Sequence, residues 1–257
     1  MKIFAIGDLH LSSSGKKPMD IFGPQWRNHW EKIAQNWKGS VGPGDLVLVP
    51  GDLSWAMRIE EARADIDWLE ALPGSKILVK GNHDYWWPSI SRLRGLLKGS
   101  SITVLQYDSV RIGPVAVGGA RLWDIPGVDI AGSTMLEQIP VAEGEELQPR
   151  HEPQDRTHDE RIFLREMGRL RLSLESMGEV SGTRIVMTHF PPTNEHGLDT
   201  AVTRILERYR VDLCVFGHLH DLKLPEGTTI DFLKNRIRYV LVSCDSVGFA
   251  PYRLLEV

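Results

Sequence analysis

The chain has 257 residues, of which 25% are charged, and its formal net charge is −4. This length allows one large domain or two small ones and is sufficient to bury a substantial core. No stretch approaches the roughly 20 apolar residues of a membrane span, and no basic cluster predicts an extended nucleic-acid surface.

Short apolar runs predict buried strands at residues 2–6, 45–49, 76–80, 184–187 and 212–216. Their length and β-branched content favour strands over helix fragments, although periodicity alone does not separate the two in runs this short. Apolar residues at three- and four-residue spacing predict helices over residues 24–38, 58–71, 88–98, 157–177 and 198–209. Strands that alternate with helices predict βαβ units and a largely parallel sheet.

The last thirty residues follow a different pattern. Strands are predicted there at 228–232, 237–243 and 252–256, and a hairpin is predicted mid-chain from 102–106 and 110–118. The chain is therefore expected to have an α/β fold with two packed sheets and helices on the outside. No linker divides it, so a single domain over residues 1–257 is expected.

Potential metal ligands directly follow all five apolar runs. They are Asp8 and His10, Asp52 after Gly51, the run Gly81-Asn82-His83-Asp84, His189, and finally His218 and His220. The carboxyl ends of strands are where open α/β sheets collect their ligands. Asp8 and His10 are two residues apart, as are His218 and His220, so each pair faces one way if its backbone is extended.

The types of these residues narrow the chemistry. No cysteine belongs to a cluster, which argues against a thiolate-rich zinc site, and imidazole, carboxylate and amide together suit manganese, iron, zinc or nickel. Two divalent cations would outweigh the carboxylates of Asp8 and Asp52 by about two charges and attract phosphate. Water between two such ions can ionise near neutral pH and attack phosphorus in line with the leaving group. His83 would then serve as general acid to the leaving oxygen, with Asp84 fixing its tautomer.

In order and approximate spacing, these motifs resemble the calcineurin-like metallophosphoesterase superfamily over most of the chain. The resemblance implies a four-layer α/β/β/α sandwich of two mixed sheets flanked by helices. It also implies two metal sites that share Asp52. Asp8, His10, Asp52 and His220 would hold one metal, and Asp52, Asn82, His189 and His218 the other.

Two departures from the superfamily pattern narrow the branch. The protein phosphatases carry Gly-Asp-x-Val-Asp-Arg-Gly at the second motif and Glu after Asn-His, whereas this chain reads Gly-Asp-Leu-Ser-Trp-Ala-Met-Arg at 51–58 and has Asp84. The Asn-His-Asp form resembles phosphodiesterase and phosphohydrolase branches, which include cyclic-nucleotide phosphodiesterases and nuclease subunits.

The principal functional prediction is a metal-dependent phosphoesterase that hydrolyses a small phosphodiester or phosphomonoester through a hydroxide bridging two metals. A nuclease is an alternative, which the lack of a basic stripe disfavours. A non-catalytic scaffold, such as the retromer subunit that resembles this fold, ranks last because every expected ligand is present. No membrane partner is expected, and the sequence does not predict an oligomeric state.

Candidate substrate contacts are Arg121, Trp87, Trp123 and His196, each with an ordinary packing or surface role as the alternative. The stretch 122–156 has little periodicity and is interpreted either as a lid over the metals or as a surface insertion. His29, His151 and His158 are expected to be structural. Cys214 and Cys244 are expected to be buried in strands without a disulfide framework, and the early Asp8 and His10 argue against a signal peptide, which together favour the cytoplasm.

Overall fold

A computed structural model describes residues 1–13, 17–128, 130, 156–194, 196–222 and 228–257. The strands are β1 (Lys2–Ala5), β2 (Leu46–Val49), β3 (Ser75–Val79), β4 (Ile102–Leu105), β5 (Ser109–Ile112), β6 (Val115–Ala120), β7 (Thr183–Thr188), β8 (Leu213–Phe216), β9 (Asp231–Lys234), β10 (Ile237–Leu241) and β11 (Tyr252–Glu256). The helices are α1 (His29–Ser40), α2 (Ile59–Glu70), α3 (Ile90–Leu96), α4 (Arg156–Ser176) and α5 (Ala201–Arg208), with 3-10 turns η1 (Met19–Phe22) and η2 (Pro24–Trp26).

The strands form two mixed sheets. The first has the order β11-β1-β2-β3-β4 and the second the order β5-β6-β7-β8-β10-β9. Strands β1 to β4 are parallel to one another, as are β6, β7, β8 and β10, while β11, β5 and β9 join their sheets antiparallel. The parallel strands of each sheet therefore end at a common edge.

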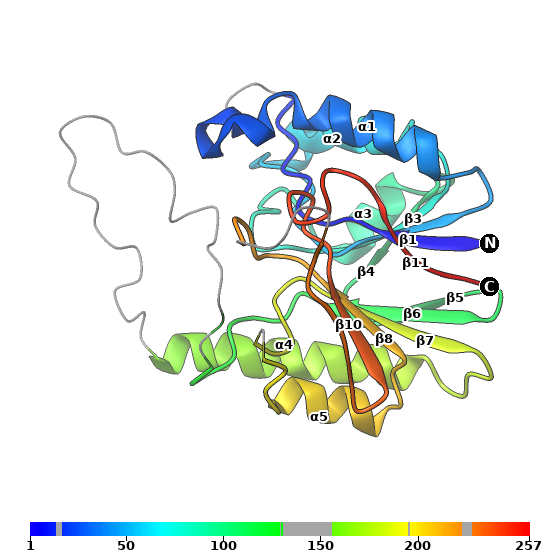
Figure 1. The fold of residues 1–257 in the computed structure, drawn as a ribbon, viewed down its shortest axis with the longest axis vertical. Helices are drawn as coiled ribbons and strands as arrows, with labels where there is room; N and C mark the ends of the chain where they lie inside the picture. The colour runs from blue at the N-terminus through cyan, green and yellow to red at the C-terminus, as the bar shows by residue number, and fades with distance from the viewer. Residues whose placement is uncertain (14–16, 129, 131–155, 195, 223–227) are drawn as a thin grey trace.

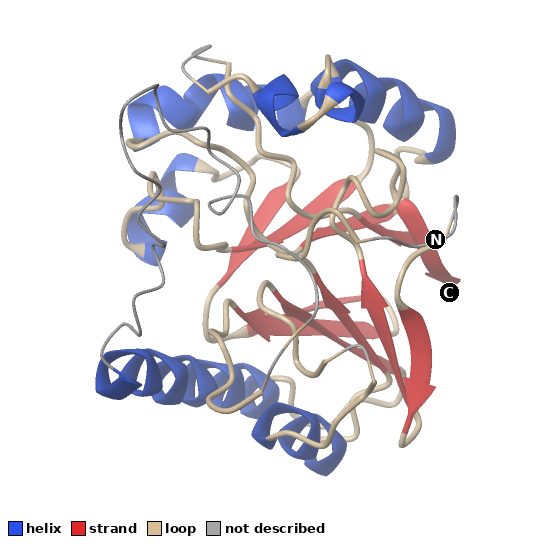
Figure 2. Cartoon of the chain, turned by 60° about the vertical axis from the view of Figure 1, so that its left-hand side comes forward, coloured by secondary structure: helices blue, strands red, loops and turns tan. Residues whose placement is uncertain are grey.

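The two sheets face each other, with helices on both outer faces (Figure 1). Helices α1, α2 and α3 cover the first sheet, and α4 and α5 cover the second (Figure 1 and Figure 2). Three apolar clusters fill the spaces between these layers. The expected four-layer α/β/β/α sandwich is confirmed.

Side-chain alternation explains why the strands read as continuous apolar runs. In β2, Val47 and Val49 pack in the cluster beneath α1 to α3, while Leu46 and Leu48 pack in the cluster between the sheets. Successive strand residues point to opposite faces, so a strand covered on both faces needs apolar residues throughout.

The predicted mid-chain hairpin is wrong. β4 pairs with β3 in the first sheet, whereas β5 and β6 pair with each other in the second. The stretch predicted as one strand at 110–118 is divided by a turn at Gly113, whose φ is +57°. A hairpin of β4 with β5 and a hairpin of β5 with β6 are both short and local in sequence. Packing against the rest of the molecule therefore selects the sheet that each strand joins.

The helix predicted over residues 24–38 is interrupted near its start. Pro24–Trp26 forms a 3-10 turn, Asn28 adopts φ +51°, and α1 begins at His29. A left-handed residue cannot continue a right-handed helix. The break changes the direction of the chain immediately before α1.

None of the helices within the described ranges has the length and apolarity needed to cross a membrane. Cys214 lies in β8 and Cys244 just beyond β10, and both are buried and free. The expectation that both are unpaired buried residues is confirmed, although Cys244 lies in a turn and not in a strand.

Candidate metal centre and active site

The seven candidate ligands meet at the carboxyl ends of the parallel strands of both sheets. They extend from the loops after β1, β2, β3, β7 and β8. All except Asn82 are buried. Packing the two sheets face to face therefore brings together donors that lie up to 212 residues apart (8 to 220) in sequence.

The first group of donors contains Asp8, His10 and His220, whose ligand atoms all lie within 4.8 Å of one another. The Nε2 atoms of His10 and His220 are 3.4 Å apart, and His220 Nε2 lies 3.8 Å from Asp8 Oδ1. Three donor atoms of two types thus converge from the two sheets.

The second group contains Asp8, Asp52 and His189, again within 4.8 Å. His189 Nε2 lies 2.5 Å from Asn82 Oδ1, and His218 Nδ1 lies 3.1 Å from the same oxygen. This group therefore extends to an amide oxygen and a second imidazole.

Asp52, a member of the second group, also lies near the first. Its Oδ2 atom is 3.9 Å from His10 Nε2 and 3.4 Å from His189 Nε2. Asp8 is the carboxylate that belongs to both groups. The carboxylates of Asp8 and Asp52 can therefore each contact donor residues of both groups.

Burial sets unusual proton affinities in this cluster. Loss of solvent raises the pKa of Asp8 to about 7 and raises that of Asp52 well above its usual range. Loss of solvent also holds the pKa values of His10 and His189 well below their usual range. Buried carboxylates without compensating charge are costly, and divalent cations would supply that charge. The oxygen and nitrogen donors therefore fit divalent metal ions.

The backbone at these donors is not extended, contrary to expectation. Asp8, His10, Asp52 and His218 have φ values of +55°, +45°, +52° and +75°. The loop after β1 runs beside the loop after β2, because Asp8 N–H donates to Gly51 O and His10 N–H to Asp52 O, both at 3.0 Å. Non-glycine residues with positive φ are uncommon and persist where the surroundings hold them, often at functional sites.

Two motif glycines allow the carboxylates to approach the backbone. A Cβ atom at Gly81 would lie 2.0 Å from Asp52 Oδ1, and one at Gly217 would lie 2.2 Å from Asp8 Oδ2. Any side chain at either position would displace a candidate ligand.

Asp84 holds the two neighbouring loops together. Its Oδ1 accepts the backbone N–H groups of Leu53 and Ser54 and the indole Nε1–H of Trp86, while Oδ2 accepts those of Asp52 and Gly81. The expectation that Asp84 fixes the tautomer of His83 is therefore wrong, since His83 Nδ1 has no hydrogen-bond partner among the described residues.

His83 lies at the edge of the donor cluster, with Nε2 3.9 Å from Asp52 Oδ2. Its ring is 4.4 Å from the ring of Trp55, which in turn stacks on His10 at 4.8 Å. Burial, followed by the charges of Lys17 and His220, lowers the pKa of His83 to about 3. The imidazole is neutral at pH 7 in the absence of bound ions.

Asp245 belongs to this site and was missed by the sequence prediction. Its Oδ1 lies 2.8 Å from His220 Nδ1, and its Oδ2 accepts the backbone N–H of Asp221. This contact fixes the His220 ring with Nε2 toward the donor cluster, as carboxylate partners do for metal-binding histidines. The only sequence signal is its position after the β10 run.

Two of the expected substrate contacts lie near the cluster. The carbonyl of Arg121 accepts the N–H groups of His189 and Phe190, and its guanidinium lies 4.7 Å from the Trp123 ring. Trp123 packs on Phe190 at 4.9 Å, and Phe190 packs on His218 at 4.1 Å. Both residues remain candidates for substrate contact.

The other two expected substrate contacts lie elsewhere. Trp87 is buried beneath the first sheet's helices and packs on Trp86, so it is a core residue and the cleft prediction is wrong. His196 is exposed on a loop held to β9 by the ammonium of Lys234 on Gly197 O. Its contact with substrate stays a prediction.

Among the other histidines, His29 is buried and structural as expected, since its ring nitrogens contact Trp26 O and Leu9 O. His158 is exposed. His151 and most of the expected lid at 122–156, namely 129 and 131–155, lie outside the described residues.

Known proteins resemble this chain in sequence pattern and in fold. The family model for calcineurin-like phosphoesterases matches residues 1–222. A phosphopantetheinyl hydrolase from Mycobacterium tuberculosis is 18% identical over 100% of this chain and 96% of its own, with a TM-score of 0.55. A protein of unknown function from Aquifex aeolicus is 17% identical over 98% and 95%, with a TM-score of 0.48. No curated protein matches the chain.

Proposed function

The chain belongs to the calcineurin-like phosphoesterase family, and we propose that it hydrolyses a small phosphodiester or phosphomonoester at a centre of two divalent cations. The observation that carries this proposal is the pair of overlapping donor groups, which share Asp8, with Asp52 of the second group 3.9 Å from His10 of the first. Membership of the family makes the chain a metal-dependent phosphohydrolase. The number of metals and the class of ester are the proposed part.

Asp8, His10, Asp52 and His220 would hold one cation, and Asp52, Asn82, His189 and His218 the other. Manganese, iron, zinc and nickel all suit this mixture of carboxylate, imidazole and amide donors. When bound, such cations supply a Lewis acid for the phosphoryl oxygens and lower the pKa of a water that attacks phosphorus in line. Asp245 would keep His220 in the tautomer that presents Nε2 to the cation.

His83 would act on the leaving oxygen. As a neutral imidazole it can donate one N–H hydrogen bond to developing negative charge, and if the substrate's phosphoryl charge raises its pKa it can transfer a proton. The dependence of rate on leaving group distinguishes these two roles.

A small ester is favoured over a nucleic acid because the chain has a formal charge of −4 and no basic stripe. A non-catalytic scaffold is disfavoured because every donor is present. We further propose one domain over residues 1–257, since both sheets contribute donors to the same cluster. The free, buried Cys214 and Cys244 support a reducing compartment such as the cytoplasm.

The test is a screen of the metal-stripped protein reconstituted separately with Mn²⁺, Fe²⁺, Zn²⁺ and Ni²⁺. Substrates are alkyl and aryl mono- and diesters, cyclic nucleotides, single-stranded DNA and a phosphopantetheinyl ester. We expect metal-dependent hydrolysis of a small ester that Asp52→Asn abolishes and that Asp67→Asn, an exposed matched control, leaves unchanged. Cleavage of DNA alone would support the nuclease, and inactivity on every ester would support the scaffold.

A further inference from the structure

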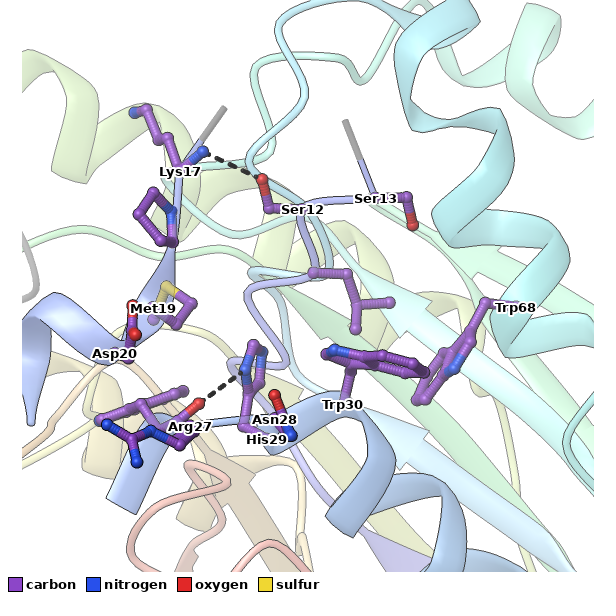
Figure 3. A pocket seen from close by; sticks show the side chains of 13 residues that line it. Ser12, Ser13, Lys17, Met19, Asp20, Arg27, Asn28, His29, Trp30 and Trp68 are labelled. Carbon is purple, nitrogen blue, oxygen red and sulfur yellow. Dashed lines mark hydrogen bonds between the residues drawn. The ribbon is translucent and has the colours of Figure 1, made fainter. Parts of the chain in front are cut away.

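A cavity of about 530 Å³ lies beside the candidate centre, formed by the loop after β1, the η1 turn and the starts and sides of α1 and α2 (Figure 3). Its volume falls within the range of small-molecule sites, roughly 300–1,000 Å³. The break in the chain before α1, at Asn28, helps to form it. The calcineurin-like motifs do not include these lining residues.

Two lining residues also contact the surroundings of the centre. The Lys17 ammonium lies 4.2 Å from the centroid of the Trp55 ring, and that ring is 4.4 Å from His83. The Trp26 ring lies 6.2 Å from the His10 ring and 5.8 Å from the His220 ring. Trp26 therefore lies between the cavity and two of the donors, and Lys17 contacts the ring that packs on His83.

The lining combines flat apolar surfaces with positive charge. Trp30, which is 46% exposed, and Trp68 lie on one side of the cavity, and Lys17 and Arg27 lie on the other (Figure 3). Asp20 is the one carboxylate among the lining residues, so the cations outnumber it. Tryptophan faces bind flat rings by stacking, and cations bind phosphoryl oxygens.

Resting on the phosphoesterase function proposed above, we propose that this cavity is the specificity site for a flat aromatic group attached to the substrate's phosphoryl group. The ring stacks on Trp30 and Trp68, and Lys17 pairs with a phosphoryl oxygen on the side nearest His83. This arrangement places the ester bond toward the donor cluster and the ring away from it. The tryptophans that the sequence singled out, 87 and 123, do not line this cavity.

The test is binding to the metal-stripped full chain, in which hydrolysis is prevented. Isothermal calorimetry compares AMP, which carries a flat ring, with ribose 5-phosphate, which lacks it. We expect AMP to bind about tenfold more tightly, because stacking of one base on aromatic side chains contributes roughly that much. Trp30→Ala should bring the two affinities within about twofold of each other, whereas Tyr107→Ala, another exposed aromatic, should preserve the preference.

Equal affinity for the two ligands, absence of AMP binding at millimolar concentration, or a preference that persists in Trp30→Ala would overturn the proposal. Lys17→Gln should weaken both ligands several-fold and equally, and unchanged affinity would overturn the placement of the phosphoryl group. These titrations do not depend on turnover. An inert enzyme would refute the proposed function, while loss of the ring preference alone would refute only this site.

Discussion

Replacing Asp84 with asparagine tests whether this carboxylate holds the two ligand-bearing loops together. Asp84 is fully buried and accepts five N–H hydrogen bonds, two at Oδ2 and three at Oδ1. An amide of the same shape can place its NH₂ at the Oδ2 position, where it faces the N–H groups of Asp52 and Gly81. Each buried donor left without an acceptor costs about 1–3 kcal/mol, so Asp84→Asn should lower the free energy of unfolding by about 2–6 kcal/mol.

A loss of this size is a large fraction of the roughly 5–15 kcal/mol of a typical domain. Urea unfolding followed by far-UV circular dichroism measures it. The matched control is Asp67→Asn, which removes an exposed ion pair with Arg63 and should cost less than about 1 kcal/mol. If the free energy of unfolding of Asp84→Asn lies within about 1 kcal/mol of the wild-type value, the structural role assigned to Asp84 is wrong.

If His83 protonates the leaving group, His83→Asn should slow alkyl esters by about 100-fold and nitrophenyl esters far less, since general acids contribute at least that much. An equal loss on both would instead assign His83 to hydrogen bonding or charge stabilisation. Removing the partner of His220 in Asp245→Asn should weaken metal binding about 10–100-fold in competition with a chelator, and unchanged affinity would contradict its positioning role. Burial raises the pKa of Asp8 to about 7 in the metal-free protein, so this carboxyl largely retains its proton at about pH 6, and burial raises the pKa of Asp52 in the same direction. Metal binding should therefore release protons there and tighten as pH rises, and a calorimetric enthalpy independent of buffer ionisation would contradict this.

The buried strands were predictable because both faces of each sheet are covered. In β2 and β8 every residue is buried, so the apolar run is continuous and its end is marked by the first polar residues. The donors after these runs were predictable for the same reason. A chain that passes from a covered strand into a loop changes residue type sharply.

The partners of these donors were not predictable, because they depend on contacts between distant segments. Asp245 meets His220 only through the return of the chain after β10, and the sequence around it has no motif. Asp84 follows His83 directly in sequence, which suggested a hydrogen bond between the two side chains. The structure does not contain this hydrogen bond. The same applies to the cavity, whose tryptophans come from the residues around α1 and from α2.

Positive φ at Asp8 and His10 also lay beyond the sequence prediction. A spacing of two residues indicates a shared direction only on extended backbone. Here the two side chains converge because the loop after β1 is hydrogen-bonded along the loop after β2. Asp8 and His10 do lie in one donor cluster, as predicted, but the extended backbone on which that prediction was based is absent there.

The number of bound cations tests the central claim most directly. The metal-stripped chain is titrated with Mn²⁺, and bound metal per chain and hydrolysis of the preferred small ester are measured in the same samples. We predict two bound cations per chain, with hydrolysis rising as the second binds. Full activity with one bound cation, or full activity in excess chelator, would contradict a centre built from the two donor groups around Asp8 and Asp52.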